Sequence, residues 1–407
     1  MRIVVWGINY APELTGISPY NTSLCEFLQR RGDDVEMLTT FAYYPAWKKR
    51  EEDRGEFYRT DIVNGVKVRR CWHYVPERVN AWRRILHEGT FVLTSTLRAL
   101  TLPAADIYVV VSPPLLLGTA AWLVTVFERR SFVFHVQDLQ PDAAVGLGML
   151  RQGWFTRALY ALEAFAYRKA VRVSSISRGM LEVFRRKGVP DEKLLYVPNS
   201  IPLPDPETLP ARGEFRARYG ISSDEFLASY AGNLGVKQGL DILLETAALL
   251  VGTNVRVLIC GDGAEREKLA AEITRRELPN VTMAPLQAGR DYSALLVDSD
   301  LCFITQQAGA GNAFFPSKLL GILAHGRGVL TVADRESELA QAVEHEGFGI
   351  NIPPGDAKRL AHELRALSGS PERLIGFANA GAKFVKQFDQ ESVLAGFATT
   401  LEQLAAQ

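Results

Sequence analysis

A lysine set among three glycines is the stretch of this 407-residue sequence best suited to binding an anion. Lys237 occurs in "YAGNLGVKQGL", residues 230–240. Glycines allow a ligand to approach the backbone closely, and the lysine supplies positive charge. The phosphate loop of nucleotide-binding proteins follows its lysine with Ser or Thr, whereas Gln238 follows here, so that motif is absent. We expect Lys237 to project from a strand-to-helix turn and contact a phosphate; the alternative is a solvated loop lysine.

A histidine and an aspartate follow another strand-like run, in "FHVQDLQPD". His135 and Asp138 stand three residues apart where the strand is expected to end. An imidazole can donate or accept a hydrogen bond near neutral pH, and a carboxylate can orient it or contact substrate hydroxyls. The pair therefore indicates a functional site, although a histidine at a strand end is often purely structural.

The loop after the first strand, "GINYAPELTGISPYN", carries a glycine just before a helix. We expect the helix to begin near Ser18 or Pro19, so that Gly16 brings the backbone close to a ligand at the helix N-terminus. An ordinary strand-to-helix turn is the alternative. The dinucleotide fingerprint GxGxxG is missing, which argues against a nicotinamide-dependent enzyme.

A second helix start is predicted within "AGAGNAFFPSKLLG". Pro316 suits the first helical turn, which would also hold Ser317 and Lys318, with Phe315 directly before it. These residues are predicted to contact a nucleotide-sugar; an ordinary helix start is the alternative.

Two acidic stretches resemble ligand sites, but neither is predicted to bind a metal. Asp298 and Asp300 imitate a metal-binding Asp-x-Asp, yet they precede a strand and so lie at its wrong end. The "CGDG" stretch follows a strand at the correct end, and its Gly263 is expected to shape a turn close to the donor. No metal site is predicted.

Composition limits the class of protein. Lys and Arg number 46 and Asp and Glu 46, so no global field favours nucleic acid. Four widely separated cysteines predict reduced, mostly buried thiols in a cytoplasmic protein, without a signal peptide at the N-terminus. The apolar run 107–127 is divided by Pro113 and Pro114 into a strand and a helix, each too short to cross a bilayer.

Strand-like and helix-like runs alternate along the whole chain, which predicts α/β domains with parallel sheets. Residues 197–210 hold five of the 20 prolines and form the best linker. We therefore expect two Rossmann-like, doubly wound domains facing across a cleft, over 1–204 and 205–388. A final helix is expected over 389–407. Ligands of such sheets bind beyond the carboxyl ends of the strands.

These loops together resemble the retaining glycosyltransferases of family 4, which have the two-domain GT-B architecture. The resemblance is nearest to the colanic-acid and exopolysaccharide branch, which includes fucosyltransferase-like members. It rests on "NYAPELTGISPYN", "YYPAWKKR", "NGVKVRRCWHYVPE", "HVQDLQPDAA", "YAGNLGVKQGLD", "ICGDGAER" and "PSKLLGILAHGR". In that family the final helix crosses back to the N-terminal domain.

The resemblance implies roles for individual residues. Lys237 would contact the donor diphosphate, His135 would lie near the transferred sugar, and Gly16 near the diphosphate. Asn233 stands where many members have an arginine. Ala313 and Gly321 stand where the wider family has two glutamates, and the second of these glutamates contacts the ribose. Ribose recognition must therefore differ here, and the "PSK" stretch is expected to compensate.

The implied reaction is transfer of a sugar from a GDP- or UDP-sugar with retention and without a metal or other cofactor. Preorganised positive charge would stabilise the leaving diphosphate. A sugar-nucleotide epimerase and a non-catalytic sugar-binding protein are the alternatives, the latter suggested by the two missing glutamates.

The acceptor is expected to meet the N-terminal domain. Residues 41–58 mix aromatic rings with both signs of charge, which suits sugar stacking or a mobile lid. Residues 80–100 predict an amphipathic helix with Trp82, Arg83, Arg84 and His87 at one end. This helix either lies on the anionic inner-membrane surface, receiving a polyprenyl-diphosphate-linked saccharide, or simply faces the core.

Overall fold

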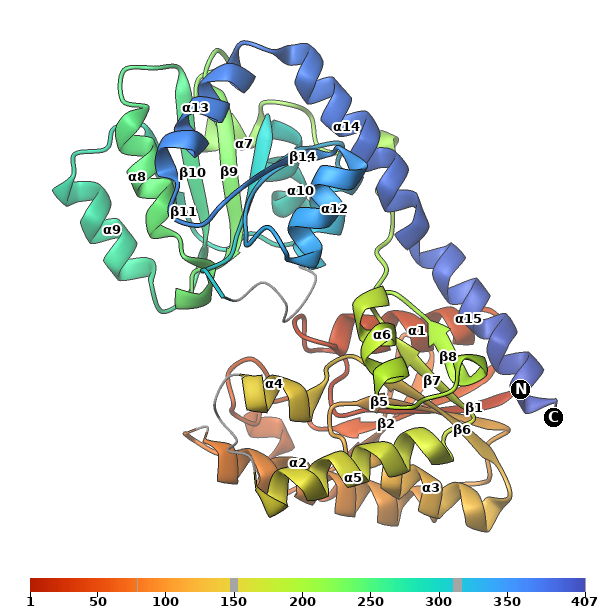
Figure 1. Cartoon of the computed structure of the whole chain (residues 1–407). Coiled ribbons are helices and arrows are strands. Elements are labelled where there is room, and N and C mark those ends of the chain that lie inside the picture. The colour runs from red at the N-terminus through yellow and green to blue at the C-terminus, as the bar shows by residue number, and fades with distance from the viewer. Residues whose placement is uncertain (79, 147–152, 310–316, 407) are drawn as a thin grey trace. The chain divides into compact units, whose positions relative to one another are not determined.

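The computed structural model describes residues 1–78, 80–146, 153–309 and 317–406. The chain forms two compact units (Figure 1). Unit 1 consists of Met1–Asn199 with Glu391–Gln407, and unit 2 consists of Ser200–Gln390.

Unit 1 is built on an eight-stranded sheet in the order β3-β4-β2-β1-β5-β6-β7-β8. Its central strands are runs of β-branched and aromatic residues buried on both sides, as parallel strands covered by helices require. The strands are β1 (Arg2–Trp6), β2 (Asp34–Thr40), β3 (Tyr58–Val63), β4 (Val66–Cys71), β5 (Ile107–Ser112), β6 (Ser131–Val136), β7 (Arg172–Ser175) and β8 (Leu194–Tyr196).

One pair of strands in unit 1 departs from the expected parallel order. β3 and β4 are antiparallel and are joined by Asn64 and Gly65, both with positive φ. Two adjacent residues with positive φ, Asn followed by Gly, are typical of a tight hairpin turn. The Asn-Gly pair was therefore the signal for a hairpin that the alternation of strands and helices does not reveal.

Helices cover both faces of the unit 1 sheet (Figure 1). One face packs against α2 (Ala81–Ala99), α3 (Leu117–Glu128), α5 (Trp154–Lys169) and α6 (Arg178–Arg186). The other packs against α1 (Ser18–Arg30) and the C-terminal helix α15 (Gln390–Ala405), whose Leu394, Phe397 and Leu401 enter the core. α4 (Gln140–Gly146) follows β6.

Unit 2 has a six-stranded, entirely parallel sheet in the order β11-β10-β9-β12-β13-β14. Its strands are β9 (Phe226–Asn233), β10 (Val255–Asp262), β11 (Val281–Ala284), β12 (Leu301–Thr305), β13 (Gly328–Val332) and β14 (Gly349–Ile352). Its helices are α7 (Glu214–Tyr219), α8 (Asp241–Leu249), α9 (Arg266–Arg275), α10 (Gly289–Asp298), α11 (Ser317–Ala324), α12 (Glu338–Glu346), α13 (Ala357–Ser368) and α14 (Pro371–Val385).

The proline-rich segment runs beside the segment that leads into α15. The amide of Ile201 donates to the carbonyl of Phe388 (3.1 Å), and the amide of Gln390 donates to the carbonyl of Ile201 (2.9 Å). These two backbone hydrogen bonds tie the two connecting segments together.

Two predictions made from composition are confirmed. The apolar run 107–127 forms β5 and α3. The four cysteines are free and buried. Among the described residues, no helix has both the length and the apolar character needed to cross a membrane.

Candidate active site

Lys237 lies at the carboxyl edge of the unit 2 sheet, in the turn between β9 and α8. It belongs to a short 3-10 helix, Val236–Gln238, and its side chain is exposed. Among the described residues no hydrogen-bond or ion-pair partner is found for its ammonium group, while its backbone carbonyl accepts a hydrogen bond from the amide of Gln307 (2.8 Å). The loop therefore holds the backbone of Lys237 and leaves its charge available.

The glycines at the end of β10 are required by its close approach to the loop that carries Lys237. β9 and β10 pair up to Gly232 opposite Gly261 and Asn233 opposite Asp262. A Cβ on Gly261 would lie 1.9 Å from the carbonyl oxygen of Gly232, and one on Gly263 would lie 2.5 Å from that of Leu234. These glycines bring the two loops together, and the Asn233 side chain lies beside Gly263.

A second lysine reaches the same loop from α11. The ammonium nitrogen of Lys318 lies 3.9 Å from the centre of the Tyr230 ring, and 3.8 Å from where a Cβ of Gly232 would stand. Burial lowers the pKa of Lys318 to about 7, with a small opposing effect from Cys302. Tyr230 also donates a hydrogen bond from its hydroxyl to the carbonyl of Asn233 (2.7 Å), so one side chain positions both the lysine and the loop.

Unsatisfied polar groups mark the end of the neighbouring strand β12. Gln306 is 7% exposed and Thr305 3% exposed. Both amide atoms of Gln306 and the hydroxyl of Thr305 are buried and find no hydrogen-bond partner among the described residues. A buried polar group without a partner is costly, and functional sites are where such groups are found. Sequence reasoning missed both residues, although two glutamines directly after an apolar strand were the available signal.

His135 lies at the end of β6 in unit 1, on the face covered by α15. Its ring packs against Phe397, with centroids 6.2 Å apart. Nδ1 lies 2.8 Å from the Ser174 hydroxyl, and Nε2 lies 2.9 Å from the side-chain amide nitrogen of Gln137. Since that amide can only donate, Nε2 accepts and the proton resides on Nδ1. Burial lowers the pKa of His135 to about 4, so the ring is neutral at pH 7.

Asp138 is exposed in the bend after β6. Desolvation by the surrounding protein raises the pKa of its carboxyl group, and Arg84 opposes that rise. The Arg84 guanidinium donates to Glu88 (3.0 Å), and Glu88 also accepts hydrogen bonds from Gln140. Arg84 thus connects Asp138 electrostatically to a polar network with Glu88 and Gln140, whereas His135 lies on the other side of the sheet.

Gly16 has a φ of 68° and directly precedes Ile17, the N-cap of α1, so the helix begins at Ser18 as predicted. Its neighbour Glu13 organises the loop. One carboxylate oxygen of Glu13 accepts from the amides of Tyr43 and Tyr44 (2.8 and 2.9 Å), and the other accepts from Asn9 (2.7 Å). The loops after β1 and β2 are therefore held together.

The aromatic residues after β2 pack mainly on one another. The ring centroid of Tyr43 lies 5.0 Å from that of His73 and 4.6 Å from that of His87. His87, predicted together with Trp82, Arg83 and Arg84 at one end of a helix that faces either a membrane or the core, faces the protein interior. It is 1% exposed, and its Nδ1 donates to the carbonyl of Tyr74 (2.6 Å). His87 lies on the side of α2 that faces the protein interior, because the exposed stripe passes through Trp82 and Leu86 instead.

The Asp298–Asp300 stretch has a structural role at the opposite edge of the unit 2 sheet. Asp298 accepts hydrogen bonds from the amides of Phe215 and Arg216, at the start of α7. Asp300 pairs with Arg212 (2.8 Å) and Arg216 (2.7 Å). Among the described residues, no group of three or more His, Cys, Asp or Glu side chains could hold a metal ion.

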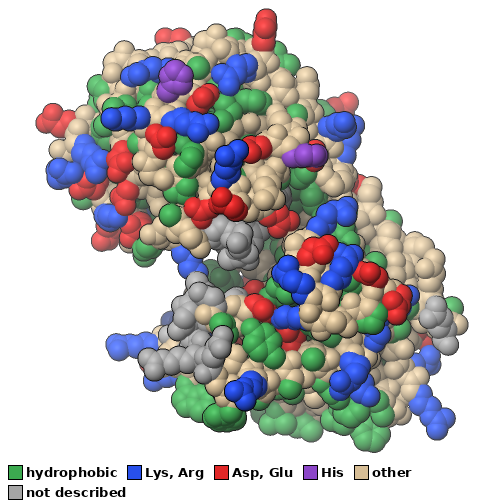
Figure 2. All heavy atoms as spheres, viewed as in Figure 1, with side chains coloured by type: hydrophobic (Ala, Val, Ile, Leu, Met, Phe, Trp, Pro, Cys, Tyr) green, Lys and Arg blue, Asp and Glu red, His purple; other side chains and the backbone are tan. Residues whose placement is uncertain are grey.

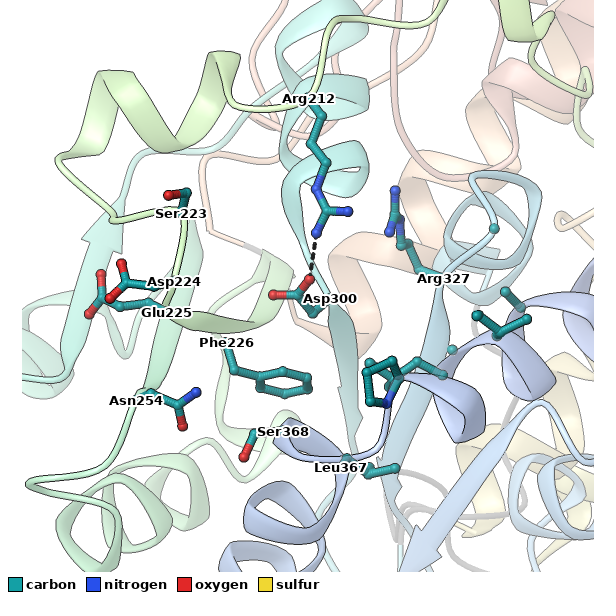
Figure 3. A pocket seen from close by; sticks show the side chains of 16 residues that line it. Arg212, Ser223, Asp224, Glu225, Phe226, Asn254, Asp300, Arg327, Leu367 and Ser368 are labelled. Carbon is teal, nitrogen blue, oxygen red and sulfur yellow. Dashed lines mark hydrogen bonds and ion pairs between the residues drawn. The ribbon is translucent and has the colours of Figure 1, made fainter.

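A cavity of about 450 Å³ opens beside this stretch (Figure 3). Arg212, Asp300 and Arg327 line it together with Phe226 and Leu367. It lies at the amino ends of β9, β12 and β13, because its lining includes the residues at or just before the start of each strand. The cavity is therefore separate from the glycine loops, which follow the carboxyl ends of the strands.

The remaining predicted residues lie at or near the start of α11. Phe315 and Pro316 lie outside the described residues, as does Ala313. Ser317 and Lys318 belong to α11, as predicted, whereas Pro316, predicted to open this helix, is among the residues outside the description.

Comparison with known proteins identifies the two parts of the chain. Residues 15–200 match the family described as Glycosyl transferase 4-like domain, and residues 211–384 match Glycosyl transferases group 1. WcaI of Escherichia coli strain K12, named for glycosyl transfer in colanic acid biosynthesis, is 31% identical over 379 residues, 90% of this chain and 91% of WcaI. WbjE of Pseudomonas aeruginosa, named as a glycosyltransferase, is 26% identical over 278 residues, 65% of this chain and 68% of WbjE.

Solved structures share the fold at lower sequence identity. Sucrose-phosphate synthase from Thermosynechococcus elongatus matches with a TM-score of 0.75 at 17% identity, covering 99% of each chain. HepE of Anabaena in complex with UDP matches with a TM-score of 0.68 at 17% identity, covering 99% of this chain and 100% of HepE. The two parallel-sheet units and these matches establish the GT-B fold. The chain belongs to the GT-B glycosyltransferases that join a glycosyl transferase 4-like domain to a glycosyl transferases group 1 domain.

Proposed function

We propose that this glycosyltransferase moves a sugar from a nucleotide diphosphate-sugar to a carbohydrate acceptor in cell-surface polysaccharide biosynthesis. The observation that carries the proposal is the pair of lysines at one glycine loop. Lys237 is exposed and has no partner within the described part of the chain, and Lys318 is desolvated against Tyr230. The name of WcaI assigns that relative to colanic acid biosynthesis, which supports an exopolysaccharide product. HepE has been solved with UDP-glucose, which supports a UDP-sugar; a GDP-sugar is the alternative donor.

The two lysines suit the electrostatic demand of the reaction. As the bond between sugar and diphosphate breaks, negative charge grows on the leaving phosphate and the sugar becomes oxocarbenium-like. Preorganised cations and backbone amides stabilise that charge most effectively in a site of low dielectric. In the proposal, Lys237 and Lys318 supply the positive charge. They do so because Asn233 stands where many family members have an arginine. We propose transfer to the front face of the sugar with retention, and without a metal.

Desolvation of Lys318 links donor binding to proton uptake. With a pKa of about 7, the side chain is partly neutral in the free protein at physiological pH. A bound diphosphate favours the charged form because opposite charges attract. Binding therefore draws a proton onto Lys318, and the resulting ammonium lies beside Gly232, next to the diphosphate.

In the proposal, His135 positions the transferred sugar and does not donate a proton. Its pKa of about 4 keeps the ring neutral at the pH of the reaction. Gln137, which donates to Nε2, is the neighbour that orients it. Gly16 and Asp138 remain the predicted contacts on unit 1, together with the loop that Glu13 holds.

The acceptor is assigned to unit 1. The exposed rings of Tyr44 and Phe57 and the network of Arg84, Glu88 and Gln140 offer stacking surfaces and hydrogen bonds, which carbohydrates require. A polyprenyl-diphosphate-linked saccharide is the acceptor class we propose. Such an acceptor requires the protein to work on a membrane surface, at the cytoplasmic face of the inner membrane.

The donor proposal is tested by binding and transfer with matched lysine variants. UDP-, GDP- and ADP-sugars are first compared by thermal shift, and the best donor is then used in a transfer assay. Lys237→Ala should lower kcat/KM at least tenfold, whereas Lys358→Ala, which removes an exposed lysine from α13, should leave it unchanged. A loss of less than about threefold for Lys237→Ala, or roughly 0.6 kcal/mol, would contradict the proposal.

The same assay separates the alternative functions. Donor binding without transfer or hydrolysis would indicate a non-catalytic sugar-binding protein. Conversion of one nucleotide-sugar into another without an acceptor would indicate an epimerase.

A further inference from the structure

Apolar side chains form a continuous exposed stripe along α2. Trp82, Leu86, Leu93 and Leu97 are 73%, 53%, 61% and 52% exposed, and Leu100, just after the helix, is 48% exposed. At 100° per residue these positions fall within about 60° of one another around the helix axis. The opposite side of α2 carries Phe91 and Ser95, both fully buried. The helix therefore buries one side in the core and exposes an apolar stripe on the side facing away from it.

The neighbouring helices extend this stripe into a surface. α3 packs beside both α2 and α5, and it exposes Leu123, Val126 and Phe127, the last at 74%. Trp154, at the start of α5, is 81% exposed. Counting Ile85, Leu100 and Leu116, this outer face carries 11 of the 21 exposed large hydrophobic side chains of the described residues. Figure 2 shows these hydrophobic side chains gathered along the lower border of unit 1, where α2, α3 and α5 lie.

Charge on this outer face is one-sided although the chain as a whole is neutral. The exposed basic residues are Arg83 on α2, Arg129 directly after α3, and Arg157, Arg168 and Lys169 on α5. Arg84 pairs with Glu88, and Arg130 pairs with Asp106.

The three acidic residues of the same helices are engaged within the protein. Glu88 pairs with Arg84 and Gln140, Glu128 accepts from the Tyr108 hydroxyl, and Glu163 pairs with Lys187. Ion pairs thus neutralise Glu88 and Glu163, whereas Glu128 keeps its charge. The exposed basic residues outnumber it, which leaves net positive charge around an apolar surface.

We propose that the outer face of α2, α3 and α5 binds the surface of an anionic lipid bilayer. Exposed tryptophan and phenylalanine rings with leucines enter the boundary between headgroups and acyl chains, and the surrounding arginines and lysines pair with anionic headgroups. Lys169 and Arg168 lie over the rings of Trp122 and Phe165, which holds their charges at the level of the apolar surface. This surface concerns attachment rather than sugar transfer, so it does not depend on the proposed donor site.

The charge pattern favours a bilayer over a second copy of the chain as the occupant of this face. A twofold dimer buries the same patch of both subunits against each other. Here that would bring two sets of basic side chains together, with fewer acidic side chains than basic ones to neutralise them. An anionic bilayer offers apolar and negative surface together, and it matches both properties of the face.

Co-sedimentation of the whole protein with vesicles tests the proposal. Vesicles of phosphatidylglycerol and phosphatidylethanolamine are compared with vesicles of phosphatidylcholine alone, at 50 and 500 mM NaCl. We expect binding to the anionic vesicles at low salt, at least fivefold weaker binding to the zwitterionic vesicles, and loss of most binding at high salt. Failure to sediment with anionic vesicles at low salt would overturn the proposal.

Matched variants locate the surface. Trp82→Ser combined with Leu93→Ser and Leu97→Ser should reduce vesicle binding at least fivefold. The control combines Leu249→Ser, Val251→Ser and Ile375→Ser, three comparably exposed side chains of unit 2, and should bind like the wild type. Thermal unfolding checks that both variants fold. Equal loss of vesicle binding in both variants, or no loss in the first, would overturn the assignment. So would a wild-type protein that does not bind vesicles but forms a dimer, if the first variant is monomeric and the control variant remains dimeric.

Discussion

The ammonium group of Lys318 lies 3.9 Å from the centre of the Tyr230 ring, directly beneath the glycine loop that follows β9. The aromatic face partly compensates the buried positive charge, yet desolvation still lowers the pKa of Lys318 to about 7. The lysine is therefore poised to change its charge when an anion binds beside Gly232.

The first prediction is that donor affinity depends on pH. Below pH 7 Lys318 is already charged, so affinity should be nearly constant. Above pH 7 binding must take up a proton, and affinity should fall by up to about tenfold per pH unit until the pKa of the bound state is reached. Calorimetric titration in buffers of different ionisation enthalpy measures that uptake.

Lys318→Arg provides the control for this pH dependence. Arginine keeps its charge at every pH used, so the variant should bind donor with a flatter profile and without proton uptake. A wild-type profile that remains flat between pH 7 and 9 would contradict the role given to Lys318.

The second prediction concerns the two functions of Tyr230. Tyr230→Phe removes the hydrogen bond to the carbonyl of Asn233 and keeps the ring under Lys318, so it should cost about 1 kcal/mol of stability. Tyr230→Leu removes the ring as well and should also weaken donor binding. The two variants are compared by urea unfolding and donor titration; equal donor affinities in both would rule out the ring as the support of Lys318.

The third prediction concerns the contact between the two glycine loops. Gly261→Ala would place a Cβ 1.9 Å from the carbonyl of Gly232, and the loop must shift to accept it. We expect a loss of about 3 kcal/mol in stability together with loss of donor binding. Gly376→Ala is the matched control, because its Cβ meets nothing within 4 Å inside α14; it should stabilise by about 0.5–1 kcal/mol. Thermal unfolding with and without donor measures both effects.

The fourth prediction is that unit 1 loses stability in mild acid. The pKa of His135 is lowered to about 4 in the folded protein and returns to about 6.5 on unfolding. The unfolded chain therefore binds the proton more tightly, so this contribution to stability is complete above pH 6.5 and declines as pH falls toward 4, by up to about 3 kcal/mol.

His135→Gln removes this titration and should make unfolding less dependent on pH between 4 and 6.5. The variant also loses bonds to Ser174 and Gln137, so its stability at pH 7 should be lower. An unchanged pH slope would indicate that His135 does not carry the effect; His87, whose pKa is also lowered to about 4, is then the next residue to replace.

Local sequence patterns predicted most of the elements because each depends on near neighbours. The β-branched run at Ile107–Ser112 forms a buried strand, and the proline pair after it ends that strand before α3. The start of α1 near Ser18 and that of α11 at Ser317 follow from the residues that precede each helix. The hairpin of β3 and β4 was not predicted because the alternation of strands and helices indicated parallel strands throughout. The Asn64-Gly65 pair was the local signal for its turn.

Site residues were predicted less completely, since their environment depends on distant contacts. Lys237 was identified by its glycines, and the structure places it exposed in the turn between β9 and α8; its ligand contact stays a prediction. His135 was identified by its position at a strand end, but which face it occupies depends on the alternation along β6 and on α15, about 260 residues further along the chain. Gln306 gave little signal, because the burial of its amide becomes evident only when β12 is packed between β9 and β13.

The sequence by itself determined that this chain forms two parallel α/β units with glycine loops at the strand ends, because periodicity, prolines and glycines act through local sterics and burial. Only the tertiary structure decided which charges meet. Lys318 acquires its lowered pKa from burial in the packed unit 2, where its ammonium lies over Tyr230, 88 residues away in the sequence. The apolar face of unit 1 exists only because three separate helices pack side by side. Desolvation and surface shape are properties of the packed chain, and no local stretch of sequence contains them.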